Sequence, residues 1–240
     1  MIGLLLAVAV ALSTPPTAPP DIPPLRPRPT PPPAVAPATT LARYAEALAA
    51  THTPLVLSFE YSVDQAGGRD IQETHRVFRS GDSERDELHT VDGKRVDPPS
   101  IHIFLGRRNR YALEALAPRP EAYTFRYLAS VHDGKHLDQV FETKPLGPAP
   151  ATVAQVTIDG ITFLPTAIRF VTNAHGGSGT VSFGRIQKYW MAVAASAAAT
   201  YGKSATVEHL TFTRYRFPTD LAPSTFSTPQ PLPTFRPTPF

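Results

Sequence analysis

The histidines and carboxylates of this chain are the side chains whose types and spacing could support metal chemistry. His132 and His136 flank the turn Asp133-Gly134, with Asp138 nearby, so a hairpin could bring two imidazoles together. A zinc site, however, needs three or four ligands in fixed geometry. We favour the simpler interpretation, a group of exposed polar residues at a hairpin tip. The sequence therefore predicts no resident metal and no cofactor.

Nucleophilic and acid–base catalysis have no clear motif either. Gly176-Gly177-Ser178-Gly179 is typical of a flexible turn, and no Gly-x-Ser-x-Gly elbow is present. Four carboxylates between positions 82 and 87 lie close to Arg79 and Arg85, which is typical of a solvated, charge-paired strand rather than of a glycosidase acid–base pair. The absence of cysteine excludes thiol catalysis and disulfides. These patterns favour a protein that is not an enzyme, although an active site of dispersed residues stays open.

Aromatic side chains give a better indication of function, because they recur on most of the expected strands. A filled hydrophobic core explains any one of them. A curled sheet with a single short helix, however, would leave part of its apolar concave face uncovered. A large apolar cavity with few polar groups suits acyl chains, of which each buried CH₂ contributes ~0.8 kcal/mol. We predict that eight aromatic residues line such a cavity: Phe59, Tyr61, Phe125, Tyr127, Phe170, Phe183, Trp190 and Phe212.

Hydrophobic periodicity predicts one helix followed by strands. Thr39 or Thr40 can cap a helix over Leu41–Ala50, whose apolar residues recur at i, i+3, i+4 and i+7, and Pro54 prevents its continuation. From Leu55 onward the period is two, as in a strand. Further strands are expected at 71–79, 84–91, 101–105, 111–116, 123–131 and 137–143, with hairpin turns at 92–93 and 133–134.

The second half continues the same pattern after a proline-rich loop at 145–150. Strands are expected at 153–158, 161–164, 166–172, 181–186, 189–200 and 205–217. The alanines of Met191–Ala199 favour a helix by propensity, but the position of this segment between two strands favours a strand, which we choose. We therefore predict a mainly β fold, with one strongly curved antiparallel sheet, an unclosed β-barrel, and the short N-terminal helix against its concave side.

Both ends of the chain differ in composition from this domain. Residues 1–13 resemble an export signal with small residues at a cleavage site, although they lack Lys and Arg; an uncleaved anchor is the alternative. Residues 14–38 form a proline-rich disordered spacer, and 229–240 form a similar tail. A single domain is therefore expected at 39–228, in an exported protein of the periplasm or the extracellular side of the cell envelope.

The charge of the chain is too small and too dispersed to indicate nucleic acid as a partner. The formal net charge is +3, whereas nucleic-acid binding requires a clustered basic stripe. The densest basic spot is Arg107, Arg108 and Arg110, which we interpret as a solvated loop, with contact to anionic headgroups as the alternative. We expect the protein to be peripheral to a membrane at most.

Several short segments of the C-terminal half resemble the LolA/LolB-type carriers of outer-membrane lipoproteins. They are Val156–Asp159 with Phe163–Ile168, Gln187–Trp190, Leu210–Pro218 and Leu221–Phe226. The resemblance extends over about residues 40–228. It implies a half-barrel lidded by helices that carries lipid, acyl chains or lipidated protein. The alternative is a structural or protein-interaction module of the envelope, with a filled core on a proline-rich stalk. No functional residue of the carriers can be matched individually.

Overall fold

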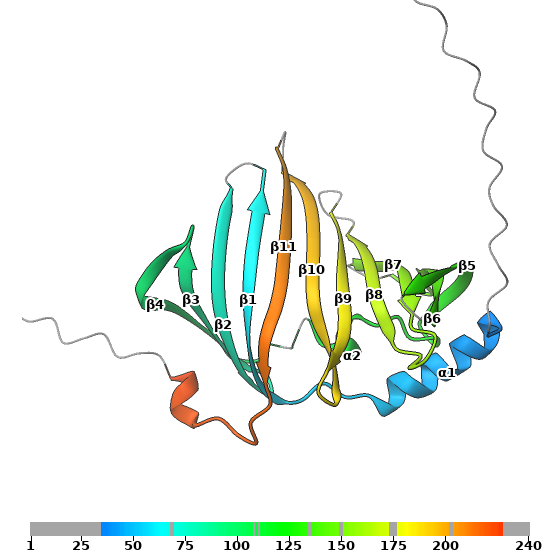
Figure 1. Cartoon of the computed structure of the whole chain (residues 1–240), viewed down its shortest axis with the longest axis horizontal. Coiled ribbons are helices and arrows are strands. Elements are labelled where there is room, and N and C mark those ends of the chain that lie inside the picture. The colour runs from blue at the N-terminus through cyan, green and yellow to red at the C-terminus, as the bar shows by residue number, and fades with distance from the viewer. Residues whose placement is uncertain are drawn as a thin grey trace, which may run out of the picture. The chain divides into compact units, whose positions relative to one another are not determined.

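The structure is a computed structural model that describes residues 35–67, 70–107, 109, 111–133, 136–148, 151–172, 177–201 and 204–227 (Figure 1). The expected export signal, the spacer up to residue 34 and the expected tail lie outside these residues. The bounds predicted for the signal, spacer, domain and tail therefore stay predictions.

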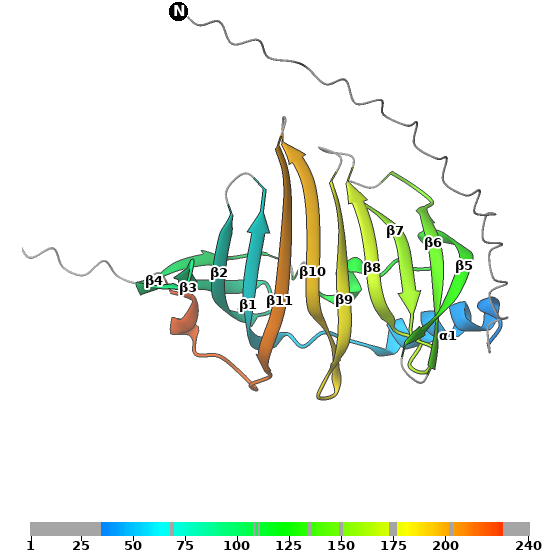
Figure 2. The same ribbon diagram turned by 45° about the horizontal axis from the view of Figure 1, so that its top comes forward.

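Eleven strands form a single antiparallel sheet in the described part of the chain, so the prediction of a mainly β fold is confirmed. The strands are β1 (Val56–Ala66), β2 (Ile71–Ser80), β3 (Ser83–Val91), β4 (Lys94–Phe104), β5 (Tyr123–Asp133), β6 (His136–Pro145), β7 (Ala151–Ile158), β8 (Pro165–Thr172), β9 (Ser178–Ile186), β10 (Tyr189–Tyr201) and β11 (Ser204–Arg216). The sheet is strongly curved and does not close into a barrel, as Figures 1 and 2 show.

The strand order combines local hairpins with one long-range pairing. The order across the sheet is β4-β3-β2-β1-β11-β10-β9-β8-β7-β6-β5. All consecutive strands except β4 and β5 pair, as the turn residues predicted; Asp92 and Gly93, for example, have φ angles of 50° and 73° in the β3–β4 turn. In addition, β1 pairs with β11, which makes β4 and β5 the sheet edges. Turn residues report only on neighbouring strands, so the sequence did not predict this pairing.

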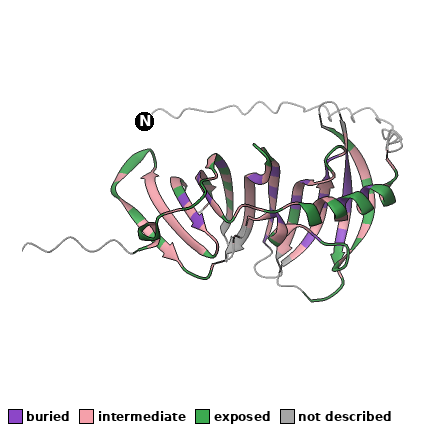
Figure 3. Ribbon diagram, turned by 90° about the horizontal axis from the view of Figure 1, so that it is seen from below, coloured by how far each residue is buried: buried purple, intermediate pink, exposed green. Residues whose placement is uncertain are grey.

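Helix α1 (Pro37–Ala50) begins four residues before the predicted start at Leu41. Pro37 occupies the first turn, where its fixed φ favours helix, and the N-cap is Ala36 without a side-chain hydrogen bond. The predicted cap by Thr39 or Thr40 is therefore wrong, because both residues lie inside the helix. Figure 3 shows α1 crossing the strands with its exposed side outward.

Tyr44 attaches α1 to the concave side of the sheet. Its side chain is fully buried, and its hydroxyl donates a hydrogen bond to the Pro118 carbonyl at 2.8 Å. Its ring meets that of Phe125 in β5 edge-on, with 5.9 Å between centroids. Burial, and less strongly the charge of Glu121, raise the pKa of the Tyr44 hydroxyl, which therefore remains a donor.

The segment between the two edge strands is helical, not extended. Residues 113–116 form the short helix α2 (Leu113–Leu116), so the predicted strand at 111–116 is wrong. A short apolar run does not by itself distinguish a strand from a helical turn. Glu114 fixes the turn because one carboxylate oxygen accepts a hydrogen bond from the Thr53 hydroxyl at 2.6 Å and the other from the Thr53 amide. In the part of the chain that the structure describes, no helix has the length and apolarity to cross a bilayer.

The predicted strand at 161–164 is also wrong, because these residues form a turn between β7 and β8. The Asp159 carboxylate accepts hydrogen bonds from the amides of Ile161 (2.9 Å) and Thr162 (2.5 Å). Phe163 adopts a positive φ of 57°. Such local bonding of an aspartate to the following amides stabilises a turn in preference to a strand. Strand β7 pairs instead with β8.

The choice of a strand for Met191–Ala199 is confirmed, since this segment is the greater part of β10. Hydrogen bonds to β9 on one side and β11 on the other outweigh the helix propensity of alanine. The alternating burial of β9, in which Gly179, Val181 and Phe183 are buried, places the core on the concave face.

Candidate functional site

Two adjoining hollows lie on the concave face beside α2, and we call them together the inner groove. The larger has a volume of about 400 Å³ and lies between α2 and strands β5, β7 and β8. The smaller, of about 220 Å³, lies over β9, β10 and β11. Leu116 and Phe170 line both. The larger hollow alone falls within the range of ~300–1,000 Å³ that is typical of small-ligand sites.

Phe170 forms the wall shared by the two hollows because of a glycine opposite to it. Phe170 in β8 pairs in register with Gly179 in β9. A Cβ atom on Gly179 would lie 2.4 Å from Cζ of Phe170 and 2.6 Å from the Ser196 carbonyl oxygen. The ring therefore rests on the backbone of β9 at a place where any larger residue would displace it.

Small and apolar side chains make up most of the remaining lining. Ala195 and Ala197 of β10 face the smaller hollow, together with Val181 and Leu210. Polar lining comes from Glu208 in the smaller hollow and from Glu114 and Arg119 in the larger one, with backbone and hydroxyl groups such as that of Ser196. This composition, mostly apolar with a few polar groups, suits an aliphatic ligand.

The eight aromatic residues predicted as lining occupy several different environments. Phe170 lines the inner groove. Phe59, Phe183 and Phe212 belong to the core and are 9%, 5% and 5% exposed. The Trp190 indole N–H donates a hydrogen bond to the Pro165 carbonyl at 2.7 Å, which holds the indole over the start of β8.

Phe125 and Tyr127 of β5 belong to the same concave face, and Phe125 packs against Tyr44 of α1. The rings of Phe125 and Tyr127 both meet Phe141 edge-on, with centroid distances of 6.3 and 5.9 Å. The Tyr127 hydroxyl shares a hydrogen bond of 2.9 Å with Ser130. The structure therefore brings the predicted aromatics onto one face of one sheet, where much of their area contacts other rings.

The sequence prediction missed the lining supplied by α2 and by the small residues of β10. Leu116 lies in an apolar run whose pattern predicts a strand, and Ala195 lies in an alanine run whose pattern indicates secondary structure but not a lining role. The useful signal was the size of these alanines, because small side chains on the concave face leave volume that aromatic neighbours do not fill.

Tyr61 differs from the other predicted lining residues because it belongs to a polar cluster. Its hydroxyl donates a hydrogen bond to Asp86 Oδ2 at 2.8 Å, and the other oxygen of Asp86 lies 2.8 Å from His75 Nδ1. The Tyr61 and His75 rings stack at 4.5 Å, and His75 Nε2 lies 3.2 Å from Glu73. Phe212 contacts Tyr61 of this cluster and also Tyr111, which lines the smaller hollow.

Asp86 and His75 change each other's titration. Burial disfavours the charged form of each side chain, but the hydrogen bond and opposite charge of the partner outweigh it. The pKa of the His75 imidazole is therefore raised, and that of the Asp86 carboxyl is lowered. Asp86 of β3 joins the three strands, because it bonds to Tyr61 of β1 and pairs with His75 of β2. The sequence, by contrast, predicts Asp86 in a solvated strand.

Of the three arginines in the basic cluster at 107–110, the structure describes only Arg107. The Arg107 guanidinium lies 3.1 Å from Glu84 and 4.1 Å above the ring centre of Phe104. Glu84 also pairs with the buried Arg79 at 2.5 Å. Glu84 therefore links Arg107 to Arg79 of β2. Arg108 and Arg110 lie outside the described residues, so contact of this basic cluster with anionic headgroups stays a prediction.

The histidine pair of the sequence analysis cannot be placed as a pair, because the His136 side chain lies outside the described part of the chain. Among the side chains that the structure describes, no group of three or more His, Asp or Glu is arranged to hold a metal ion.

Comparison with known proteins finds similar structures at low sequence identity. The sequence matches no protein-family model and no curated protein. A "putative outer membrane lipoprotein-sorting protein domain" of Vibrio parahaemolyticus is 16% identical with a TM-score of 0.45, covering 79% of this chain and 96% of that one. A DUF1329 family protein of Desulfovibrio piger is 8% identical with a TM-score of 0.46 and the same coverage.

A chain of the MucA/MucB complex of Pseudomonas aeruginosa is 10% identical, with a TM-score of 0.25 and coverage of 73% of this chain and 92% of that one. A lipoprotein-sorting domain is thus among the similar structures, as the sequence resemblance predicted. With TM-scores this low, the ligands and partners of these proteins give no guide to those of this chain.

Proposed function

We propose that this chain is a non-enzymatic binding protein of the cell envelope that holds an acyl chain, of a lipid or of a lipidated protein, in the inner groove. The observation that carries the proposal is the apolar wall formed by Leu116 and Phe170, which lines both hollows. The location in the envelope rests on the export-like residues 1–13. The proposed partners are lipid or acylated protein, with no role for nucleic acid.

The physical basis of the proposal is that an acyl chain gains binding energy by burying its apolar surface, whichever way the chain is oriented in the groove. Each CH₂ group removed from water contributes ~0.8 kcal/mol, so an acyl chain can be held firmly by length alone. Glu208, Glu114 and Arg119 line the groove, and a polar group at the end of such a chain can meet them there. A groove of this kind selects for an aliphatic ligand more than for a particular headgroup.

A second candidate function is a protein-interaction module with a filled core. The packing of Phe183 and Phe212, each 5% exposed, favours it, because these rings occupy concave area that a ligand would otherwise use. This alternative predicts that the inner groove does not bind an aliphatic molecule.

Filling the smaller hollow separates the two candidates. Ala195→Trp places an indole in the hollow, whereas Ala194→Trp, one residue away on the same strand, directs it to the opposite face. Titration of the full chain with a dansyl-labelled fatty acid should show binding by the wild type and by Ala194→Trp. Binding by Ala195→Trp should be at least about ten-fold weaker, equivalent to ~1.4 kcal/mol.

Circular dichroism and thermal melting of both variants confirm that each is folded before the titration. The proposal is contradicted if the wild type does not bind the probe, or if both tryptophan variants bind it equally well.

A further inference from the structure

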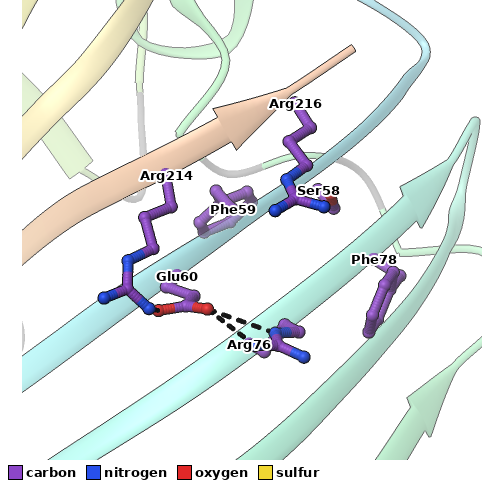
Figure 4. Close-up of a pocket in the computed structure, with 7 residues that line it drawn as sticks. All are labelled: Ser58, Phe59, Glu60, Arg76, Phe78, Arg214 and Arg216. Carbon is purple, nitrogen blue, oxygen red and sulfur yellow. Dashed lines mark hydrogen bonds and ion pairs between the residues drawn. The ribbon is translucent and has the colours of Figure 1, made fainter. Parts of the chain in front are cut away.

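The outer face of the sheet carries a hollow of about 280 Å³ over strands β1, β2 and β11, which we call the outer hollow. Its lining is Ser58, Phe59, Glu60, Arg76, Phe78, Arg214 and Arg216. Figure 4 shows the three arginines arranged around it, with one carboxylate among them. Glu60 and Arg76 face each other across β1 and β2, on the opposite face from the buried Leu57 and Val77.

A β-bulge in β11 places two of these arginines on the same side. Ser58 pairs with Arg216 and Glu60 with Thr213, so β11 has one extra residue between the two pairs. Arg214 occupies this position with a φ of 52°. The bulge directs Arg214 to the outer face beside Arg216, while Tyr215 between them stays inside, stacked on Phe59 at 5.3 Å.

This backbone conformation is costly, and the ion pairs that it allows do not account for it. A residue other than glycine is strained in the left-handed region. The bond gained is one between exposed Arg214 Nη1 and Glu60 Oε2, at 2.8 Å. Exposed ion pairs contribute little net stability. The bulge also keeps Tyr215 inside, where its hydroxyl donates a hydrogen bond to the Ala192 carbonyl at 2.7 Å. On the outer face its effect is to redirect Arg214 to a place beside Arg216, as bulges that re-aim a side chain do.

The charge in the outer hollow is unbalanced. Glu60 accepts hydrogen bonds from Arg76 (2.8 and 3.2 Å) and from Arg214 (2.8 Å). Arg216 has no ion-pair or hydrogen-bond partner among the residues that the structure describes, and Figure 4 shows its guanidinium beside Ser58, away from the Glu60 carboxylate. Three cations thus face one anion.

Neighbouring charges on β3 do not correct this imbalance. Glu87 lies opposite Arg76 in the register, but its carboxylate is bonded to Arg85 at 2.6 Å and lies 3.1 Å from His89. The outer hollow therefore retains an excess of positive charge next to the Ser58 hydroxyl and the Phe78 ring.

We propose that the outer hollow binds a phosphate-type oxyanion, with Arg216 and the free donors of Arg76 and Arg214 as its ligands and Ser58 as an additional donor. Guanidinium groups bind phosphate and carboxylate oxygens with paired, charge-assisted hydrogen bonds. The phosphate can belong to a lipid headgroup or to a soluble phosphate ester. This site lies on the opposite face from the inner groove. The proposal of an oxyanion site is therefore independent of whether the inner groove binds an acyl chain.

The test compares two arginines of the outer face. Arg216→Gln removes a guanidinium that lines the outer hollow without breaking the bonds of Glu60. Arg169→Gln is the matched control, because Arg169 is an exposed residue of β8 next to the buried Ile168, and therefore points outward away from the outer hollow. Both variants lower the net charge by one.

Two probes are used with the full chain: glycerol phosphate in solution by calorimetry, and vesicles of phosphatidylcholine with phosphatidylglycerol by sedimentation, with pure phosphatidylcholine as the blank. The wild type should bind at least one probe. Arg216→Gln should weaken that binding about ten-fold, as expected for loss of a charge-assisted contact, and Arg169→Gln should leave it nearly unchanged.

Binding of glycerol phosphate identifies a soluble phosphate ester as sufficient, whereas binding of the anionic vesicles alone identifies a headgroup; each supports the oxyanion site. The inference is overturned if neither probe binds, or if Arg169→Gln weakens binding as much as Arg216→Gln, which would indicate only the general charge of the protein.

Discussion

Phe170 and Tyr61 show at the residue scale that aromatic side chains of the same sheet face can have different roles. Phe170 has only apolar atoms and lines the inner groove. Tyr61 has a hydroxyl that donates to Asp86, and its ring stacks on His75. The sequence pattern, which reports the face of a strand, did not distinguish them, because the Tyr61 partners come from β2 and β3. A polar end of an aromatic residue finds a partner when it is buried.

The pair of Asp86 and His75 predicts a pH dependence of stability. The raised pKa of His75 means that its contribution is complete below the ordinary histidine pKa of ~6.5 and is lost as the pH rises through the raised value. The lowered pKa of Asp86 means that its contribution is present above the ordinary aspartate pKa of ~3.9 and is lost as the pH falls through the lowered value. The pair is therefore most stabilising between ~pH 4 and ~pH 6.5.

We expect His75→Gln to lower the free energy of unfolding most at about pH 5–6, by ~1–2 kcal/mol, and progressively less above the ordinary histidine pKa. Urea denaturation at several pH values measures this difference. His209→Gln serves as the control, because His209 is exposed on β11. A difference between wild type and His75→Gln that stays constant from pH 5 to pH 9 would be evidence against this charge pair.

At the scale of elements, the pairing of β8 with β9 and the short helix α2 together build the inner groove. Strand β9 contributes Gly179, on which Phe170 rests, and α2 contributes Leu116. Helix α2 contacts β10, where alanines face it. The hollow therefore depends on one glycine and a few alanines at sites where larger residues would close it.

Gly179→Ala should consequently have a large effect for a single methyl group. The new Cβ would overlap the Phe170 ring and the Ser196 carbonyl oxygen, and the backbone oxygen cannot move aside without breaking the sheet. We expect a loss of ~1–3 kcal/mol of stability, typical of overpacking, together with weaker binding of the fatty-acid probe as Phe170 moves into the groove.

Gly184→Ala is the control on the same strand, since its Cβ would meet only the two Val193 methyl groups, at 3.3 and 3.9 Å, and this side chain can shift. Thermal melting and probe titration compare the two variants. Equal effects of the two substitutions would show that Phe170 is not held in place by Gly179.

The sequence predicted elements well where the signal was local. The alternating pattern and the turn residues predicted most strands and hairpins, including β10 despite its alanines. It failed at 161–164, where the Asp159 carboxylate organises a turn, and at 111–116, where contacts of Glu114 with Thr53 stabilise α2. In both places a side-chain hydrogen bond decided the structure, which hydrophobic periodicity does not report.

At the scale of the whole sheet, pairing of the first and last strands determines which strands form the edges. Because β1 pairs with β11, strands β8 to β11 lie in the interior of the sheet and the edges fall at β4 and β5, on either side of α2 in the chain. The lining of the inner groove comes from α2 and six strands between residues 111 and 210. The presence of this groove depends on the contact of α2 with strands later in the chain, so the sequence predicted a concave apolar face but not the location of its free volume.

The two faces of this sheet carry hollows with different linings, one mostly apolar and one rich in arginine. The concave face carries the inner groove, and the outer face carries the arginine-lined hollow. A protein with both could hold an apolar chain on one side while its other side contacts phosphate groups, and the tests described for each face are independent.

The measurement that tests the central claim most directly is native mass spectrometry of the full chain purified from cells under mild conditions, followed by lipid extraction of the same sample. The proposed function predicts a population with added mass that the extract identifies as molecules containing acyl chains. It also predicts loss of that population in Ala195→Trp but not in Ala194→Trp. A protein that carries no acyl-containing molecule, and acquires none when incubated with envelope lipids, would contradict it.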